Sequence, residues 1–225
     1  TDDLSGTLNG VYTSMSGIKF GDVKLITTQE QIDNNPKLVE DGITMQTPVR
    51  DIKNYNDYNY YVVYHLHEHI DTSHCLLVQP DGFVLFPDKW DDAWLEYDYI
   101  GAPFIPRAKN YSYSRDKFGD FYSIGNGGFS LRSLNLLKAA SKYKLSDIKS
   151  RTENHEDGFF SVYHRKFLES KGFKWAPFSI AKKFSIENPL TFREFFNLPF
   201  GFHGKKLLRL HPKILLTRVF SIFLL

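Results

Sequence analysis

Short apolar runs with strand character alternate along this chain of 225 residues with longer segments whose apolar residues recur every three or four positions. Such alternation is typical of an α/β domain, in which helices cover the faces of a sheet. With only 15 glycines and 10 prolines, the sequence does not belong to the collagen-like or low-complexity classes. No repeat or linker interrupts the pattern, so we expect one domain over residues 1–204 and a tail over residues 205–225.

The first half of the chain predicts two helices and two strands. Helical spacing covers Leu4–Ser16, and strand-like runs cover Val23–Ile26 and Cys75–Gln79. Thr47 predicts the start of a second helix over Pro48–His69, because a threonine hydroxyl caps a helix and proline is tolerated in the first turn. The buried face of this helix is expected to consist of apolar residues three or four positions apart: Ile52, Tyr55, Tyr58, Val62 and Leu66.

The apolar run Cys75–Gln79 ends in the turn sequence Pro80-Asp81-Gly82. Ligands of open α/β sheets bind at the carboxyl ends of the strands, and this is where Asp81 is expected to lie. A carboxylate there can hold Mg²⁺ or Mn²⁺ together with a diphosphate, because both ions prefer oxygen ligands. The same three residues also form a good turn without any ligand, so both interpretations remain open.

Gly125-Asn126-Gly127-Gly128 interrupts the chain shortly before a helix expected to begin near Leu134. A block of this composition does not form the interior of a stable element, but it lets the backbone approach a ligand or another strand closely.

Glu156 and Asp157 precede a segment with helical spacing, which places both carboxylates in the first turn of a helix. A carboxylate at such a place can accept the proton of a bound hydroxyl and act as a general base. Helix capping explains the same pair equally well at the level of local sequence.

Histidines provide two candidate metal sites. His65 and His69 share one face of the expected helix, but His67 points away from it, so these residues and the nearby His74 do not predict a convergent zinc site. His203 lies in an apolar, glycine-rich loop, where a structural role is usual. It can complete a metal shell only if the fold returns it to Asp81.

Charge is balanced over the chain as a whole but not at its end. The formal net charge of +2 provides no field for binding nucleic acid, and the single cysteine, Cys75, excludes an intrachain disulfide.

No acidic residue follows Glu194, whereas the tail carries five basic residues among leucines and isoleucines. This tail is expected either to pack on its own domain or to contact anionic lipid. Its closing run, Val219–Leu225, is too short to cross a membrane, which takes about 20 residues. Because the first ten residues are polar, we expect a cytoplasmic protein, with peripheral contact to the inner face of the membrane through the tail.

Five sequence blocks occur together in one order. They are Leu76-Leu77-Val78-Gln79-Pro80-Asp81-Gly82, Tyr97-Asp98-Tyr99-Ile100-Gly101-Ala102-Pro103, Gly125-Asn126-Gly127-Gly128-Phe129-Ser130-Leu131-Arg132, Glu156-Asp157 and Phe200-Gly201-Phe202-His203-Gly204. In this order they resemble a largely bacterial family of glycosyltransferase-like proteins of the GT-A type, long classed as a domain of unknown function. The resemblance covers about Ile18–Gly204, and its second and third blocks are the specific ones.

The resemblance implies a single GT-A-like domain with a Rossmann-like mixed sheet, a nucleotide-sugar donor and a glycan or lipid-linked glycan acceptor. It implies that Asp157, with Glu156 beside it, is the catalytic base of an inverting transfer, and that Asp81 and His203 hold Mn²⁺ or Mg²⁺. The residues that it places around donor and acceptor are Gln79, Asp81, Asp98, Tyr99, Gly125, Asn126, Gly127 and Gly128. Gln79 departs from the family pattern, because it stands where the first carboxylate of an Asp-x-Asp motif is expected.

Two other functional classes remain open. A non-catalytic module that binds a carbohydrate or nucleotide could keep the glycine block, and Gln79 favours this alternative. A metal hydrolase would instead use the histidines between His65 and His74.

Overall fold

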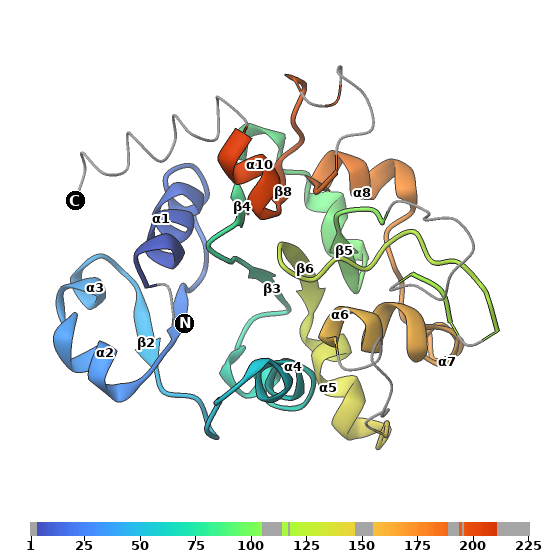
Figure 1. Ribbon diagram of the computed structural model, residues 1–225, viewed down its shortest axis with the longest axis horizontal. Coiled ribbons are helices and arrows are strands. Elements are labelled where there is room, and N and C mark those ends of the chain that lie inside the picture. The colour runs from blue at the N-terminus through green and yellow to red at the C-terminus, as the bar shows by residue number, and fades with distance from the viewer. Residues whose placement is uncertain are drawn as a thin grey trace.

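The computed structural model describes residues 4–104, 114–116, 118–146, 155–188, 194 and 196–210. Within these residues the chain has the expected mixed α/β architecture, but its short strands form three small sheets instead of one. Figure 1 shows the N-terminal elements, in blue, on one side of the central strands, and most helices of the second half on the other side.

The central sheet has the strand order β3 (His74–Leu77), β6 (Ser130–Ser133) and β5 (Tyr99–Gly101), and both outer strands run antiparallel to β6. Its register places Arg132 of β6 between Cys75 and Tyr99. Because this sheet lies in the main core, Arg132 is fully buried. The strand predicted over Cys75–Gln79 is thus confirmed as β3, with slightly earlier bounds.

The second sheet consists of β4 (Gly82–Val84), β8 (Gly201–His203) and β7 (Ser185–Ile186). Gln79 and Gly82 exchange backbone hydrogen bonds of 2.9 and 3.0 Å, so the expected turn at Pro80-Asp81 is present. Gly82 pairs with His203. The expectation that His203 lies in a loop is therefore wrong: the segment is held as a strand because the Phe202 ring packs against Phe83 in a buried cluster.

The N-terminal part has a small core of its own, formed by Leu25, Leu38 and Ile43. Its elements are α1 (Leu4–Met15), β1 (Lys24–Ile26), α2 (Gln29–Asn34), α3 (Lys37–Glu40) and β2 (Thr44–Gln46), with β1 and β2 parallel. The first helix and the first strand are confirmed close to their expected bounds.

The helix expected over Pro48–His69 is shorter than predicted. α4 spans Tyr55–Tyr64, and a 3-10 turn follows at Leu66–His69. Asn54, not Thr47, caps α4: its Oδ1 accepts hydrogen bonds from the backbone N–H groups of residues 56 (2.9 Å) and 57 (3.1 Å), and asparagine caps better than threonine. The expected buried face is correct at Val62 and Leu66 but wrong at Ile52 and Tyr55, which are exposed.

The remaining helices surround the second half of the chain. They are α5 (Leu134–Lys142), α6 (Glu156–Gly158) with a π-helical turn at Phe159–Tyr163, α7 (Arg165–Ser170), α8 (Phe178–Phe184) and α10 (Lys205–Leu210), and 3-10 turns lie at Pro87–Lys89 and Asp92–Glu96. The predicted helix after the glycine block is α5, and Ser133 caps it. Among the described helices, none has both the length and the apolar character needed to cross a membrane.

Candidate functional site

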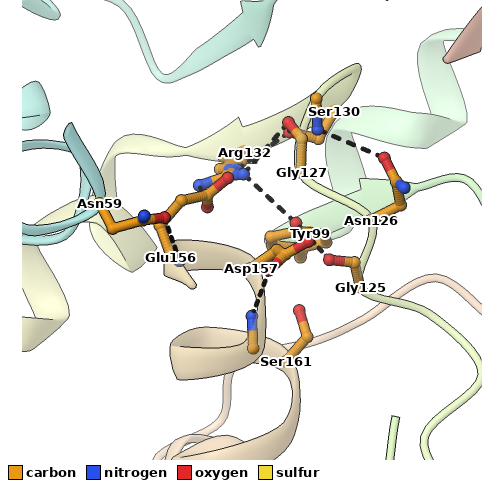
Figure 2. A network of polar contacts seen from close by, with 12 residues as sticks. Asn59, Tyr99, Gly125, Asn126, Gly127, Ser130, Arg132, Glu156, Asp157 and Ser161 are labelled. Atoms are coloured by element: carbon orange, nitrogen blue, oxygen red, sulfur yellow. Dashed lines mark hydrogen bonds and ion pairs between the residues drawn. The ribbon is translucent and has the colours of Figure 1, made fainter. Parts of the chain in front are cut away.

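A buried ion pair between Arg132 and Glu156 lies at the centre of the candidate site (Figure 2). Arg132 Nη1 lies 2.6 Å from Glu156 Oε2, and both side chains are almost completely inaccessible. The guanidinium also packs 4.9 Å over the ring of Tyr99. Because a buried charge is stable only when it is paired and hydrogen-bonded, each partner depends on the other. Glu156 is therefore a neutralised, positioning carboxylate.

Asp157 occupies a different electrostatic environment, although it is the next residue. Burial and the nearby negative charge of Glu156 raise the pKa of its carboxyl from 3.8 to about 7, against the opposing effects of the Gly158 N–H and Arg132. Asp157 Oδ1 accepts a 2.7 Å hydrogen bond from Gly158 N. The α6 turn thus presents two adjacent carboxylates: Glu156 is paired with Arg132, and the raised pKa of Asp157 suits it to accepting a proton near neutral pH.

Polar contacts fix the glycine block against this charge network. Tyr99, which is fully buried, donates its hydroxyl proton to the carbonyl of Gly125 at 2.9 Å, and Ser130 Oγ donates to the carbonyl of Gly127 at 2.9 Å. Arg132 Nη2 lies 3.3 Å from the same Gly127 carbonyl. A side chain at position 127 would place its Cβ 2.1 Å from Glu156 Oε1, so only glycine fits beside the ion pair.

The next glycine contacts the second candidate group. A Cβ at Gly128 would lie 2.0 Å from His203 Nε2. The β4–β8 pairing brings His203 back to Asp81, whose Oδ1 lies 3.9 Å from Nε2, and Gly204 N donates to the Asp81 carbonyl at 2.7 Å. Adjacent glycines therefore separate Asp157 on one side from the Asp81–His203 pair on the other. The structure brings together these three predicted residues, which are far apart in sequence.

Asp81, Asp157 and His203 form the candidate cluster, and Glu187, which the sequence analysis did not identify, also belongs to it. It follows β7, and its Oε1 lies 3.8 Å from His203 Nδ1. Asn126 Nδ2 donates a 3.0 Å hydrogen bond to Glu187 Oε2. The sequence around Glu187 does not indicate a site residue, because a single acid after a two-residue strand is a common pattern. Only the parallel β7–β8 pairing places Glu187 beside His203.

Asp81 and His203 fit a divalent cation in part. Their facing atoms provide one oxygen and one nitrogen, and the 3.9 Å between them allows a shared ion at ordinary bond lengths of about 2.1 Å. Within the described residues, no group of three or more histidine, cysteine or acidic side chains could hold a metal. A cation here would therefore need further oxygens from a ligand such as a diphosphate.

Two residues expected to bind donor or acceptor have other partners. The oxygens of Asp98 accept hydrogen bonds from Ser133 Oγ (2.5 Å) and Lys174 N (2.8 Å), so this carboxylate ties the residue before β5 to neighbouring segments, and its contact with donor or acceptor stays a prediction. Gln79 Nε2 donates to the Tyr58 hydroxyl at 2.9 Å. This contact gives Gln79 a structural partner in the place where the family pattern expects a metal-binding carboxylate.

The four clustered histidines do not form a metal centre in the described part of the chain. His65 contacts Glu68, and His74 Nε2 lies 3.2 Å from the Tyr97 carbonyl. His69 is buried between the Tyr61 hydroxyl and Gln46 Oε1, which lies 2.6 Å from its Nδ1.

A cavity of about 760 Å³ adjoins the cluster without being lined by Asp81, Asp157 or His203. It reaches the cluster through Glu187 and through Phe104, whose ring lies 2.7 Å from the Cβ position of Gly125. Aromatic walls from Trp94 and Phe178 and amide groups of asparagines line it, which suits a ligand with both apolar and polar faces.

The described part of the basic tail packs on its own domain. Leu207 of α10 is buried in a cluster with Phe83, Leu198 and Phe202, whereas Lys205 and Lys206 are exposed. Residues 211–225 lie outside the described residues, so membrane contact through them stays a prediction.

A family model described as "Protein of unknown function (DUF5672)" matches residues 43–203, a span that contains all the cluster residues above. No curated protein matches the chain.

Proposed function

We propose, for a chain that belongs to the DUF5672 family, that the cluster transfers a sugar from a nucleotide-sugar donor to a hydroxyl of a glycan or glycolipid acceptor, on a fold of the GT-A type. The observation that carries the proposal is the carboxylate of Asp157, whose pKa is raised. It lies next to the Arg132–Glu156 ion pair, and Gly127 and Gly128 separate it from His203. Such a group can accept a proton at neutral pH without a second base.

In the proposed reaction, Asp157 accepts the proton of the acceptor hydroxyl as its oxygen attacks the anomeric carbon. The bond between this carbon and the diphosphate oxygen breaks, the electron pair leaves with the diphosphate, and the configuration inverts. Arg132 holds Glu156 in place through the ion pair, and burial, together with the nearby Glu156 carboxylate, keeps the proton affinity of Asp157 high.

Asp81 and His203 would hold Mn²⁺ or Mg²⁺, which when bound neutralises negative charge on the diphosphate. We place the reacting hydroxyl of the acceptor at Asp157 and the rest of the acceptor toward the cavity next to Glu187, because this cavity adjoins the glycine block without occupying the Asp81 side of His203. The nucleotide-sugar donor then lies along the Asp81 side.

The test measures sugar release and thermal shift with a panel of uridine and guanosine diphosphate sugars, with and without Mn²⁺. We expect at least one donor to raise the melting temperature and to be slowly hydrolysed. Asp157→Asn should lower this hydrolysis by about 10²- to 10⁴-fold while keeping the thermal shift. Asp51→Asn, at an exposed acid far along the chain, is the matched control and should keep both.

The Gln79–Tyr58 contact favours one other function, a non-catalytic module that binds the same ligands. A thermal shift with no hydrolysis or transfer in the wild-type protein would support it and contradict the transferase. The absence of any shift with the whole panel would contradict both functions.

A further inference from the structure

Glu187 lies beside a buried nitrogen of His203. Among the residues that the structure describes, His203 Nδ1 has no hydrogen-bond partner, and Glu187 Oε1 lies 3.8 Å from it. The gap exceeds a direct hydrogen bond of about 3.0 Å, but a movement of about 0.8 Å closes it. A buried ring nitrogen of this kind needs a partner, and the carboxylate provides it.

The orientation of Glu187 is fixed from the opposite side by Asn126. Gly128 N donates to Asn126 Oδ1 at 3.3 Å, so the Asn126 amide nitrogen must face outward. This nitrogen donates to Glu187 Oε2 at 3.0 Å and leaves Oε1 directed toward His203. Backbone, amide, carboxylate and imidazole thus form one chain of contacts that begins in the glycine block.

From this chain of contacts we infer that Glu187 is a positioning residue, which holds the proton of neutral His203 on Nδ1 and so keeps the Nε2 lone pair directed at Asp81. A carboxylate can only accept a hydrogen bond, and each imidazole nitrogen faces one, Glu187 at 3.8 Å from Nδ1 and Asp81 at 3.9 Å from Nε2. Nδ1 is the buried nitrogen and Asn126 holds the Glu187 carboxylate in place, so the single proton of the neutral ring is assigned to Nδ1. The other nitrogen, next to Asp81 and Gly128, is then free to bind a cation or accept a proton. The role assigned to Nε2 rests on the proposed function, but the position of the proton does not.

Replacing Glu187 with glutamine should move this proton. Asn126 presents a donor, so the glutamine oxygen must face Asn126, and the glutamine NH₂ group then faces His203 Nδ1. Nδ1 becomes an acceptor, and the proton moves to Nε2. Glu187→Ala removes the acceptor altogether and should also release the proton from Nδ1.

The experiment records ¹⁵N chemical shifts of the His203 ring in the free protein near pH 8, with the signals assigned by comparison with His203→Asn. We expect the Nδ1–H form in the wild type and in the control Glu30→Gln, which removes an exposed acid of α2, and the Nε2–H form in Glu187→Gln. An Nε2–H form in the wild type would overturn the inference. So would an unchanged tautomer in folded Glu187→Gln and Glu187→Ala.

A second measurement separates this inference from the proposed function. Titration with Mn²⁺ in the presence of uridine diphosphate, which supplies the further oxygens, followed by electron paramagnetic resonance, should show about 10- to 100-fold weaker binding in Glu187→Gln than in the wild type. If the wild type binds no Mn²⁺, the proposed metal role is wrong, while the tautomer result still decides the role of Glu187.

Discussion

At the scale of single residues, the environment of each carboxylate matters more than its presence. Glu156 and Asp157 are adjacent, yet one is neutralised by a buried arginine and the other is not. A similar division separates Asp98, whose oxygens bind neighbouring segments, from Asp81, which faces an imidazole. Residue type and spacing alone cannot distinguish the members of these pairs.

The raised pKa of Asp157 predicts a specific dependence of stability on pH. The folded protein binds this proton more tightly than the unfolded chain does, so the stabilisation is complete below pH 3.8 and is lost as the pH rises through about 7. Asp157→Asn cannot ionise, so its stability relative to the wild type should increase between pH 4 and pH 8, by about 1–2 kcal/mol for this partly accessible group. Urea unfolding of both proteins at the two pH values measures the difference, and parallel curves would contradict the pKa assignment.

The ion pair of Arg132 and Glu156 predicts strong coupling. Arg132→Met leaves a buried, unpaired carboxylate and should cost about 3–5 kcal/mol of unfolding free energy. Glu156→Leu should cost a similar amount, but the double variant should lose clearly less than the sum of the two. Urea unfolding of the four proteins provides the double-mutant cycle, and additive losses would show that the two charges do not depend on each other.

At the scale of elements, short segments with little side-chain volume hold the cluster together. The glycine block lies between α6 and β8 and contacts both, while the tight turn before β4 determines where Asp81 meets His203. Pairing of β8 with β4 and β7 brings Asp81 and Glu187 to opposite nitrogens of one imidazole.

Gly128→Ala tests this arrangement. Its methyl group would lie 2.0 Å from His203 Nε2 and must displace the ring. We expect the variant to remain folded and to lose the donor-induced thermal shift in the presence of Mn²⁺. Gly21→Ala is the matched control, because its methyl group would meet only Thr72 at 3.7 Å and should leave the shift unchanged. An unchanged shift in Gly128→Ala would exclude His203 from the donor site.

At the scale of the whole molecule, two regions differ in how much apolar surface they bury. The main core surrounds the central sheet and contains large aromatic side chains such as Trp94, Phe129 and Phe184. The N-terminal core contains three buried residues under a two-stranded sheet, and residues 4–42 also precede the family match.

This difference predicts separate opening of the N-terminal part. Hydrogen exchange should be faster for the amides of β1 and β2 than for those of β6, because opening a small core exposes less apolar surface. Exchange followed by mass spectrometry under native conditions measures both. Equal protection of the two sheets would show that the molecule opens only as one unit.

Sequence by itself determined the features that depend on neighbouring residues. The alternation of apolar periods predicted the α/β class, and local backbone preferences predicted α1, the turn at Pro80-Asp81, the break at the glycine block and the helical first turn at Glu156-Asp157. Even at this level, Thr47 and Asn54 can both cap a helix. The predicted helix began after Thr47, whereas α4 begins after Asn54.

Only the tertiary structure decided which of these residues act together. Burial of Arg132 beside Glu156, the burial that raises the pKa of Asp157 and the approach of Glu187 to His203 all depend on contacts between residues far apart in sequence. The physical reason is that a charge or a proton responds to the atoms within a few ångströms, and folding, not chain order, selects those atoms.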